Sequence, residues 1–92
     1  MKFMTTWSVQ PGALKEAVGR FIATQGKPPA GATLVNRWHS ADCCGGFTLI
    51  ESDNPAAVYE AAAIWADLLD INTSLVIEDA AAGPILAKIY KD

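Results

Sequence analysis

The sequence is poor in side chains that bind metals or carry redox chemistry. It contains one histidine, His39, and two cysteines, Cys43 and Cys44, which are adjacent. Zinc sites need several Cys or His ligands at wider spacings, and haem ligation through His39 would need further pocket residues that no motif identifies. A disulfide between neighbouring cysteines closes a strained ring, and cytosolic thiols stay reduced. We therefore expect no metal, no cofactor and two free thiols at a turn.

Long apolar runs and an excess of basic charge are also missing. No stretch approaches the roughly 20 apolar residues of a membrane helix, and residues 1–9 are too short for a signal peptide. The formal net charge is −3, and the seven Lys and Arg residues are scattered. These features argue against binding to nucleic acid or to anionic membranes, and we expect a cytoplasmic protein. Phosphate-binding glycine loops and the common zinc-protease and serine-hydrolase motifs are absent as well.

The length of the chain predicts one domain that spans residues 1–92. Hydrophobic residues make up 51% of the sequence, which is typical of a globular protein. A chain this short buries only about 60–65% of its unfolded surface, so a lone core would be marginally stable. We therefore expect a homodimer in which two copies share apolar surface.

The periodicity of apolar residues predicts an α+β domain. The expected strands are Lys2–Val9, Thr33–Ser40, Phe47–Ser52 and Ile71–Glu78, and the expected helices cover Leu14–Ile22, Pro55 to about Leu68, and a C-terminal stretch from Glu78-Asp79 that Gly83-Pro84 restarts or kinks. The order βαββαβ is the ferredoxin-like pattern, with a four-stranded antiparallel sheet and both main helices on one face.

The second and third strands form a hairpin around Asp42-Cys43-Cys44-Gly45-Gly46, whose glycines are available for positive φ. An even-numbered loop makes opposed residue numbers sum to an odd value, so Arg37 and His39 share a face with Ile50. We expect that face to be open and buried in the dimer, whereas a bulge at the glycines would exchange the two faces. The expected open-face residues are Val35, Arg37, His39 and Ile50, and those expected under the helices are Leu34, Trp38 and Leu49.

Two residues on the second strand are candidate catalytic groups. The ordinary pKa of a histidine side chain suits proton transfer near neutrality, so His39 is a candidate general base. Arg37 lies two residues away and is able to hold a carboxylate or an enolate through paired hydrogen bonds. The alternatives are a hydrogen-bonded histidine at a strand end and an arginine in an ion pair between subunits.

Four further residues are candidate ligand contacts. Trp7, Trp38 and Trp65 are able to line an aromatic pocket between sheet and helices, although each also suits an ordinary core. Glu51 would attract attention if buried, because burial raises the pKa of a carboxyl group. Its alternative is a carboxylate that reaches solvent or pairs with Arg37 of the other subunit.

Several short motifs resemble the family called domain of unknown function 3303. They are Phe3-Met4-Thr5-Thr6-Trp7 with Pro11-Gly12, Pro28-Pro29, Arg37-Trp38-His39, Gly46-Phe47 leading to Glu51, and Trp65-Ala66-Asp67-Leu68-Leu69-Asp70. The resemblance covers nearly the whole chain and implies a dimeric α/β barrel, in which two ferredoxin-like sheets face each other. Relatives with that architecture include small monooxygenases, lactone isomerases, haem-dependent peroxidases and stress-responsive proteins. The break at Gly83-Pro84 departs from the unbroken final helix that the resemblance implies.

Three hypotheses of function follow from these features. The first is a cytoplasmic homodimer that binds a small organic molecule in a partly apolar pocket. The second is a cofactor-independent monooxygenase or isomerase in which His39 is the base and Arg37 stabilises an enolate. The third is a structural or interaction protein without a small ligand, in which Arg37, His39 and Glu51 pair across the two-fold axis.

Overall fold

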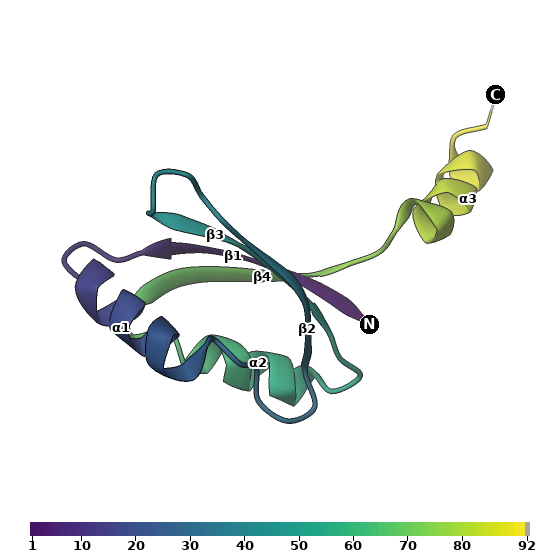
Figure 1. The fold of residues 1–92 in the computed structure, drawn as a ribbon. Coiled ribbons are helices and arrows are strands. Elements are labelled where there is room, and N and C mark those ends of the chain that lie inside the picture. The colour runs from purple at the N-terminus through teal and green to yellow at the C-terminus, as the bar shows by residue number, and fades with distance from the viewer. Residues whose placement is uncertain (92) are drawn as a thin grey trace.

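A computed structural model describes residues 1–91, so the last residue of the expected 1–92 domain, Asp92, lies outside the described part. The described residues form one four-stranded sheet and three helices. In Figure 1 the last helix stands apart from the sheet and from the two helices packed against it. The elements in chain order are β1 (Lys2–Val9), α1 (Leu14–Thr24), β2 (Thr33–His39), β3 (Gly45–Glu51), α2 (Pro55–Ala63), β4 (Leu69–Val76) and α3 (Asp79–Ile89).

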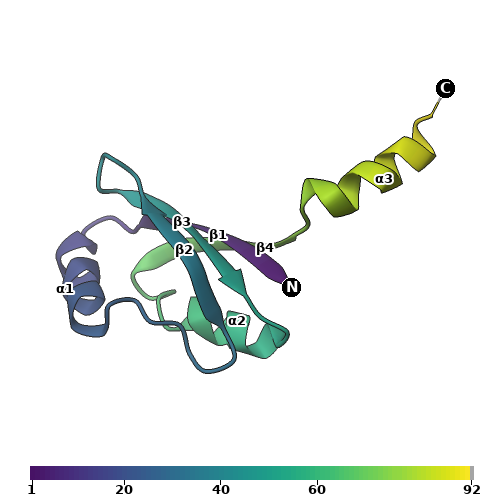
Figure 2. The ribbon, with the colours of Figure 1, turned by 45° about the vertical axis from the view of Figure 1, so that its right-hand side comes forward.

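The sheet has the strand order β2-β3-β1-β4, and every neighbouring pair is antiparallel. The two strands that are central in the sheet, β1 and β3, are separated in sequence by α1 and β2. Figures 1 and 2 show α1 and α2 on the same face of the sheet. The ferredoxin-like α+β fold predicted from the sequence is thereby confirmed.

The second helix ends about five residues earlier than the periodicity predicts, and β4 starts two residues earlier. Residues 64–68 form turns instead, and side chains from elsewhere bind carbonyl groups of this segment. The guanidinium of Arg20 donates to the carbonyl of Ile64. The side-chain amide of Gln10 donates to the carbonyl of Ala66 and to that of Leu69, the first residue of β4. These tertiary hydrogen bonds replace partners that a longer helix would have supplied.

The hairpin shows the pairing parity that an even-numbered loop predicts. Arg37 lies opposite Thr48, and Trp38 lies opposite Phe47, so opposed numbers do sum to an odd value. Arg37, His39 and Ile50 therefore share one face of the sheet, and Trp38 and Leu49 share the other.

The predicted assignment of those faces, however, is wrong. Thr5 pairs with Thr48, so Thr48 takes the same side as the first-strand residues that α1 and α2 cover. This long-range pairing, which no short turn dictates, decides which side is covered. Beneath the helices lie Arg37, His39 and Ile50, which were expected on the open face. On the open face lie Trp38 and Leu49, which were expected beneath the helices.

A β-bulge in β2 changes the alternation at its start. Leu34 pairs with Ile50 and Asn36 with Leu49, so Val35 is the extra residue of the bulge. The bulge moves Leu34 onto the covered face together with Arg37 and leaves Val35 exposed. Leu34 therefore lies under the helices as predicted, but for a different reason.

Gly45 and Gly46 are required because neighbouring backbones pack closely against them, and not because they adopt a positive φ. Neither has a positive φ, and the turn instead places Cys43 in the left-handed region at φ 68°. A Cβ atom on Gly45 would overlap the carbonyl oxygen of Trp7, and one on Gly46 would overlap that of Trp38. Glycine is needed here because the neighbouring backbones leave no space for a side chain.

The buried apolar core is small. Its central cluster consists of Phe3, Ile50 and Val58, with Ala32 and Ala61 packed against it. Asn54 caps the N-terminus of α2, because its side-chain oxygen accepts a hydrogen bond from the backbone amide of Ala56. Pro55 then occupies the first helical position. This cap fixes where α2 starts and so brings Val58 over the sheet.

The third helix projects away from the rest of the molecule, as both ribbon views show (Figures 1 and 2). None of its residues is buried, and Pro84 lies inside one continuous helix rather than breaking it. The radius of gyration is 15.6 Å, compared with about 12 Å for a compact chain of this length. Within residues 1–91, no helix combines the length and the hydropathy that crossing a membrane requires.

Candidate functional site

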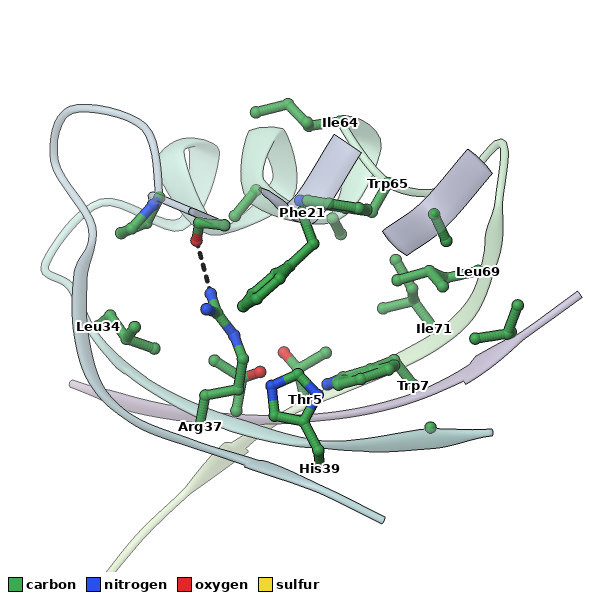
Figure 3. Close-up of a pocket in the computed structure, with 18 of the residues that line it drawn as sticks. Thr5, Trp7, Phe21, Leu34, Arg37, His39, Ile64, Trp65, Leu69 and Ile71 are labelled. Atoms are coloured by element: carbon green, nitrogen blue, oxygen red, sulfur yellow. Dashed lines mark hydrogen bonds between the residues drawn. The ribbon is translucent and has the colours of Figure 1, made fainter. Parts of the chain in front are cut away.

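A pocket of about 420 Å³ lies between the covered face of the sheet and the helices α1 and α2 (Figure 3). The sheet contributes the side chains of one face of each strand, because alternate residues of a strand point to the same side. The helices contribute their apolar stripes from above. Prominent lining residues are Thr5, Trp7, Phe21, Leu34, Arg37, His39, Trp65 and Ile71.

Arg37 reaches across the pocket to the C-terminal end of α1. Its Nη2 donates a hydrogen bond to the carbonyl of Gly26, and its Nη1 lies 3.5 Å from the carbonyl oxygen of Gln25. Gln25 and Gly26 have φ values of 57° and 60°, so the chain turns in the left-handed region at this helix end. The carbonyl groups at a helix C-terminus carry partial negative charge, which favours a cation there.

Gly26 leaves just enough space for this arginine. A Cβ atom at position 26 would lie 2.7 Å from Nη1 and 2.9 Å from Cζ of Arg37. These distances are shorter than van der Waals contact, so a larger residue would displace the guanidinium. The glycine therefore does two jobs, because it also adopts the positive φ easily.

No carboxylate within residues 1–91 forms a salt bridge with Arg37. Burial without a paired charge lowers the pKa of its guanidinium from the ordinary value, yet arginine remains protonated in proteins. Arg20 offers a contrast, because it forms two hydrogen bonds of 2.8 Å with the carboxylate of Asp67. Among the described residues, Arg37 thus places in the pocket a positive charge whose hydrogen-bond partners are neutral carbonyl groups and whose cation–π partner is an aromatic ring.

His39 is held by aromatic rings at an exposed position of the pocket. Its ring centre lies 5.4 Å from that of Trp7 and 5.4 Å from that of Phe21, at interplanar angles of 81° and 77°. Edge-to-face pairs of this kind are attractive. Within residues 1–91 its side chain forms no hydrogen bond, so the expected alternative of a hydrogen-bonded histidine is not what the structure shows. Its ring nitrogens are therefore able to serve a bound molecule.

The structure brings four of the six predicted site residues together. Arg37, His39, Trp7 and Trp65 all line the pocket (Figure 3), and the guanidinium of Arg20 lies 5.5 Å from the ring centre of Trp65. That cation–π contact and the Arg20–Asp67 pair fix the Trp65 ring after the end of α2.

The other two predicted residues lie elsewhere. Trp38 is on the open face, where its ring centre is 6.3 Å from that of Phe47. Glu51 is at the end of β3, where one carboxylate oxygen lies 3.0 Å from the amino group of Met1 and the other 3.9 Å from Nζ of Lys2. The ion pairs that the interaction-protein hypothesis expected between subunits are not supported, because Arg37 and His39 lie under the helices.

Sequence reasoning missed two features of the site. Phe21 lies within the expected helix Leu14–Ile22 and was not named as a candidate, yet it contacts both Arg37 and His39. The carbonyl groups of Gln25 and Gly26 follow that expected helix, where no site was predicted. The glycine shortly after the expected helix, Gly26, was a usable signal, because glycine is common where helices end in the left-handed region.

Metal binding has no obvious centre in the part of the chain that the structure describes. No group of three or more His, Cys, Asp or Glu side chains lies close together there. Cys43 lines the pocket at its edge and Cys44 lies beside it, both exposed and both without a disulfide bond. The polar groups that line the pocket include the guanidinium of Arg37 and the imidazole of His39, beside aromatic walls.

Comparison with known proteins supports one assignment. No curated protein matches the chain. The family described as Domain of unknown function (DUF3303) matches residues 1–90, a range that includes every strand, every helix and all the pocket residues. The match agrees with the resemblance carried by the Arg37-Trp38-His39 motif. This chain therefore belongs to the domain of unknown function 3303 family.

Proposed function

We propose that this protein binds a small organic molecule in the pocket between the sheet and the helices. The observation that carries the proposal is the pocket itself, about 420 Å³ of space with mostly apolar walls and a few polar side chains, among them Arg37 and His39. Ligand pockets in proteins have this size and this composition.

Incomplete burial of the walls supports the proposal. Trp7, Phe21 and Ile71 lie between two layers of structure but are only half-buried. Protein interiors are normally packed to high density, so large side chains between layers are expected to touch on all sides. A bound apolar molecule would bury these surfaces and contribute roughly 25 cal/mol for each Å² removed from water.

A thermal-shift screen tests the proposal directly. The probes are aromatic acids, lactones and quinones, and we expect at least one of them to raise the melting temperature. Val18→Trp should abolish this shift, because Val18 lines the pocket and an indole would fill it. Ile22→Trp is the matched control, since Ile22 lies one turn later on α1, outside the pocket and exposed. A screen in which no probe stabilises the protein would refute the proposal.

The enzyme hypothesis is a second candidate, because Arg37 and His39 line the same pocket and both contact the Phe21 ring. Residues two apart on a strand place their Cα atoms about 7 Å apart. A substrate between them would have its acidic C–H near His39 and its developing enolate near Arg37. His39→Ala should then abolish turnover of any substrate that the screen identifies, while the circular dichroism spectrum stays unchanged.

The homodimer belongs to the same proposal and uses the open face of the sheet. That face carries Trp38 and Phe47, whose side chains are 44% and 49% exposed, together with Leu49 and Met4. Apolar side chains clustered on one face commonly mark an interface. Two copies placed face to face would bury both patches and form the dimeric α/β barrel that the resemblance implies. A cytoplasmic location is part of the proposal too, and the free thiols of Cys43 and Cys44 agree with a reducing compartment.

A further inference from the structure

The pocket walls carry charge of one sign only. No Asp or Glu of residues 1–91 lines the pocket, whereas Arg37 and Lys27 do. The chain as a whole is acidic, with a formal net charge of −3. The pocket is thus a positively charged region in a protein whose net charge is negative. An anion would be attracted to the pocket, whereas the rest of the surface would on average repel it.

The guanidinium of Arg37 has hydrogen-bond donors left for a ligand. A guanidinium carries five N–H groups, and the carbonyls of Gly26 and Gln25 face only two of its nitrogens. The same two carbonyls and the Phe21 ring, 5.3 Å from Cζ, hold the group in one orientation. A fixed, planar group with unused donors suits a planar carboxylate, which accepts two parallel hydrogen bonds.

The rest of the lining suits flat apolar rings. Trp7, Phe21 and Trp65 come from three separate segments of the chain and contribute aromatic surfaces to one space (Figure 3). Aromatic rings attract one another in edge-to-face and offset arrangements beyond the gain from burial alone. Lys27 lies exposed at the edge, so Arg37 is the cation best placed to meet a single charged group.

We infer that the pocket selects aromatic monocarboxylates, with the carboxylate on Arg37 and the ring between Trp7, Phe21 and Trp65. This inference rests on the proposed function and narrows it to one chemical class. It also places His39 beside the ring of the ligand rather than beside the carboxylate. The aromatic neighbours of His39 are Trp7 and Phe21, and these two side chains would hold that ring.

Matched probes that differ only in charge test the inference. Isothermal titration of the full chain with 2-naphthoate and with 2-naphthamide compares an acid and a neutral molecule of nearly the same shape. We expect the acid to bind about 10- to 100-fold more tightly, the range expected for hydrogen bonds to a charged group. Arg37→Gln should remove this preference, and Arg37→Lys should keep only part of it. Lys15→Gln, which removes a positive charge from an exposed position on α1, should leave the preference intact.

The possible outcomes separate the inference from the proposed function. Equal binding of acid and amide would overturn the inference while the pocket remains a ligand site. An acid preference that survives Arg37→Gln would also overturn it, because the charge would then be recognised elsewhere. Failure of both probes, together with failure of every compound in the thermal-shift screen, would refute the proposed function itself. If Arg37→Gln does not fold, Arg37→Lys decides, since a full preference in that variant contradicts paired recognition.

Discussion

The guanidinium carbon of Arg37 lies 5.3 Å from the centre of the Phe21 ring, and this contact connects the hairpin to the first helix. The same ring meets His39 edge-on, so one side chain of α1 orients both polar groups of the pocket. Phe21 is half-buried and belongs to the apolar stripe of α1, which explains why its sequence position gave no hint of this second role.

A double-mutant cycle should measure this contact. Phe21→Leu keeps an apolar side chain but removes the ring, and Arg37→Gln removes the charge. We expect the loss of unfolding free energy in the double variant to differ from the sum of the losses in the two single variants by about 0.5–1 kcal/mol, the usual range for a cation–π pair. Urea denaturation measures all four proteins. Phe21→Leu combined with Lys15→Gln is the control cycle, and coupling of the same size there would contradict the assignment.

Gly26→Ala should destabilise the protein more than Gly12→Ala. Both glycines have positive φ, 60° and 80°, so each substitution introduces strain of about 1–2 kcal/mol. Only at position 26 would the new Cβ meet another group, the guanidinium of Arg37; position 12 has no atom within 4 Å. Urea denaturation should give the larger loss for Gly26→Ala, and that variant alone should lose affinity for 2-naphthoate. Equal losses in both measurements would show that the close fit has no consequence.

Stability at low pH should report the Arg20–Asp67 pair. Hydrogen bonds from Arg20 lower the pKa of Asp67 below its ordinary value of 3.8. A carboxyl group whose pKa is lower in the folded state stabilises the protein above the unfolded value, and this contribution is lost as the pH falls through the folded value. Asp67→Asn should therefore be less stable than the wild type at pH 7, and the difference should shrink below pH 3.8. In urea titrations, the difference in unfolding free energy between the wild type and Arg20→Gln should shrink over the same pH range. A difference that does not depend on pH would contradict this role of the ion pair.

Phe47→Asp should split the proposed dimer while the monomer stays folded. Phe47 lies on the open face of the sheet, where a charge is harmless in one copy but would be buried between two. Burying an unpaired charge costs several kcal/mol. Light scattering at micromolar concentration should show a monomer for Phe47→Asp and a dimer for Tyr59→Asp, since Tyr59 is exposed on the outer side of α2.

Ile50→Asp distinguishes the two faces of the same strand. Ile50 is 6% exposed and belongs to the central core cluster, so this variant should lose its folded circular dichroism spectrum altogether. A folded monomer of Ile50→Asp would instead place that residue at the interface, as the sequence alone had suggested. A wild-type protein that is monomeric at micromolar concentration would overturn the dimer.

The hairpin shows how far sequence reasoning reaches. An even-numbered turn predicts that opposed residue numbers sum to an odd value and that Arg37 shares a face with Ile50, and this local consequence of loop length is confirmed. Which face the helices cover depends on the pairing of Thr5 with Thr48, and those residues are far apart in the sequence. Both faces of β3 carry apolar residues, Ile50 on one and Leu49 on the other, so hydrophobicity does not choose between them. The bulge at Val35 is a further feature that no short-range pattern in the sequence predicted.

The candidate site was predictable where it depends on side-chain type. Arg37 and His39 were identified because few residue types carry a cation or a base, and their spacing of two keeps them on one face. The carbonyl groups that position Arg37 belong to Gln25 and Gly26, and backbone groups leave no mark on a sequence beyond the glycine itself. Trp38 was predicted with Trp7 and Trp65 because tryptophan alone does not reveal which layer it joins.

Because α3 projects from the domain, the unfolding of this helix should be an equilibrium separate from the unfolding of the sheet and the other helices. An isolated helix of about 12 residues is marginally stable in water, and α3 has 11 residues, none of them buried. Its amide protons should therefore exchange with solvent through local fraying in a single copy of the chain. The amides of β1 and β3, hydrogen-bonded on both sides in the centre of the sheet, should exchange only when the whole domain opens. Protection of the α3 amides that rises with protein concentration would measure, residue by residue, contacts that a lone chain does not provide.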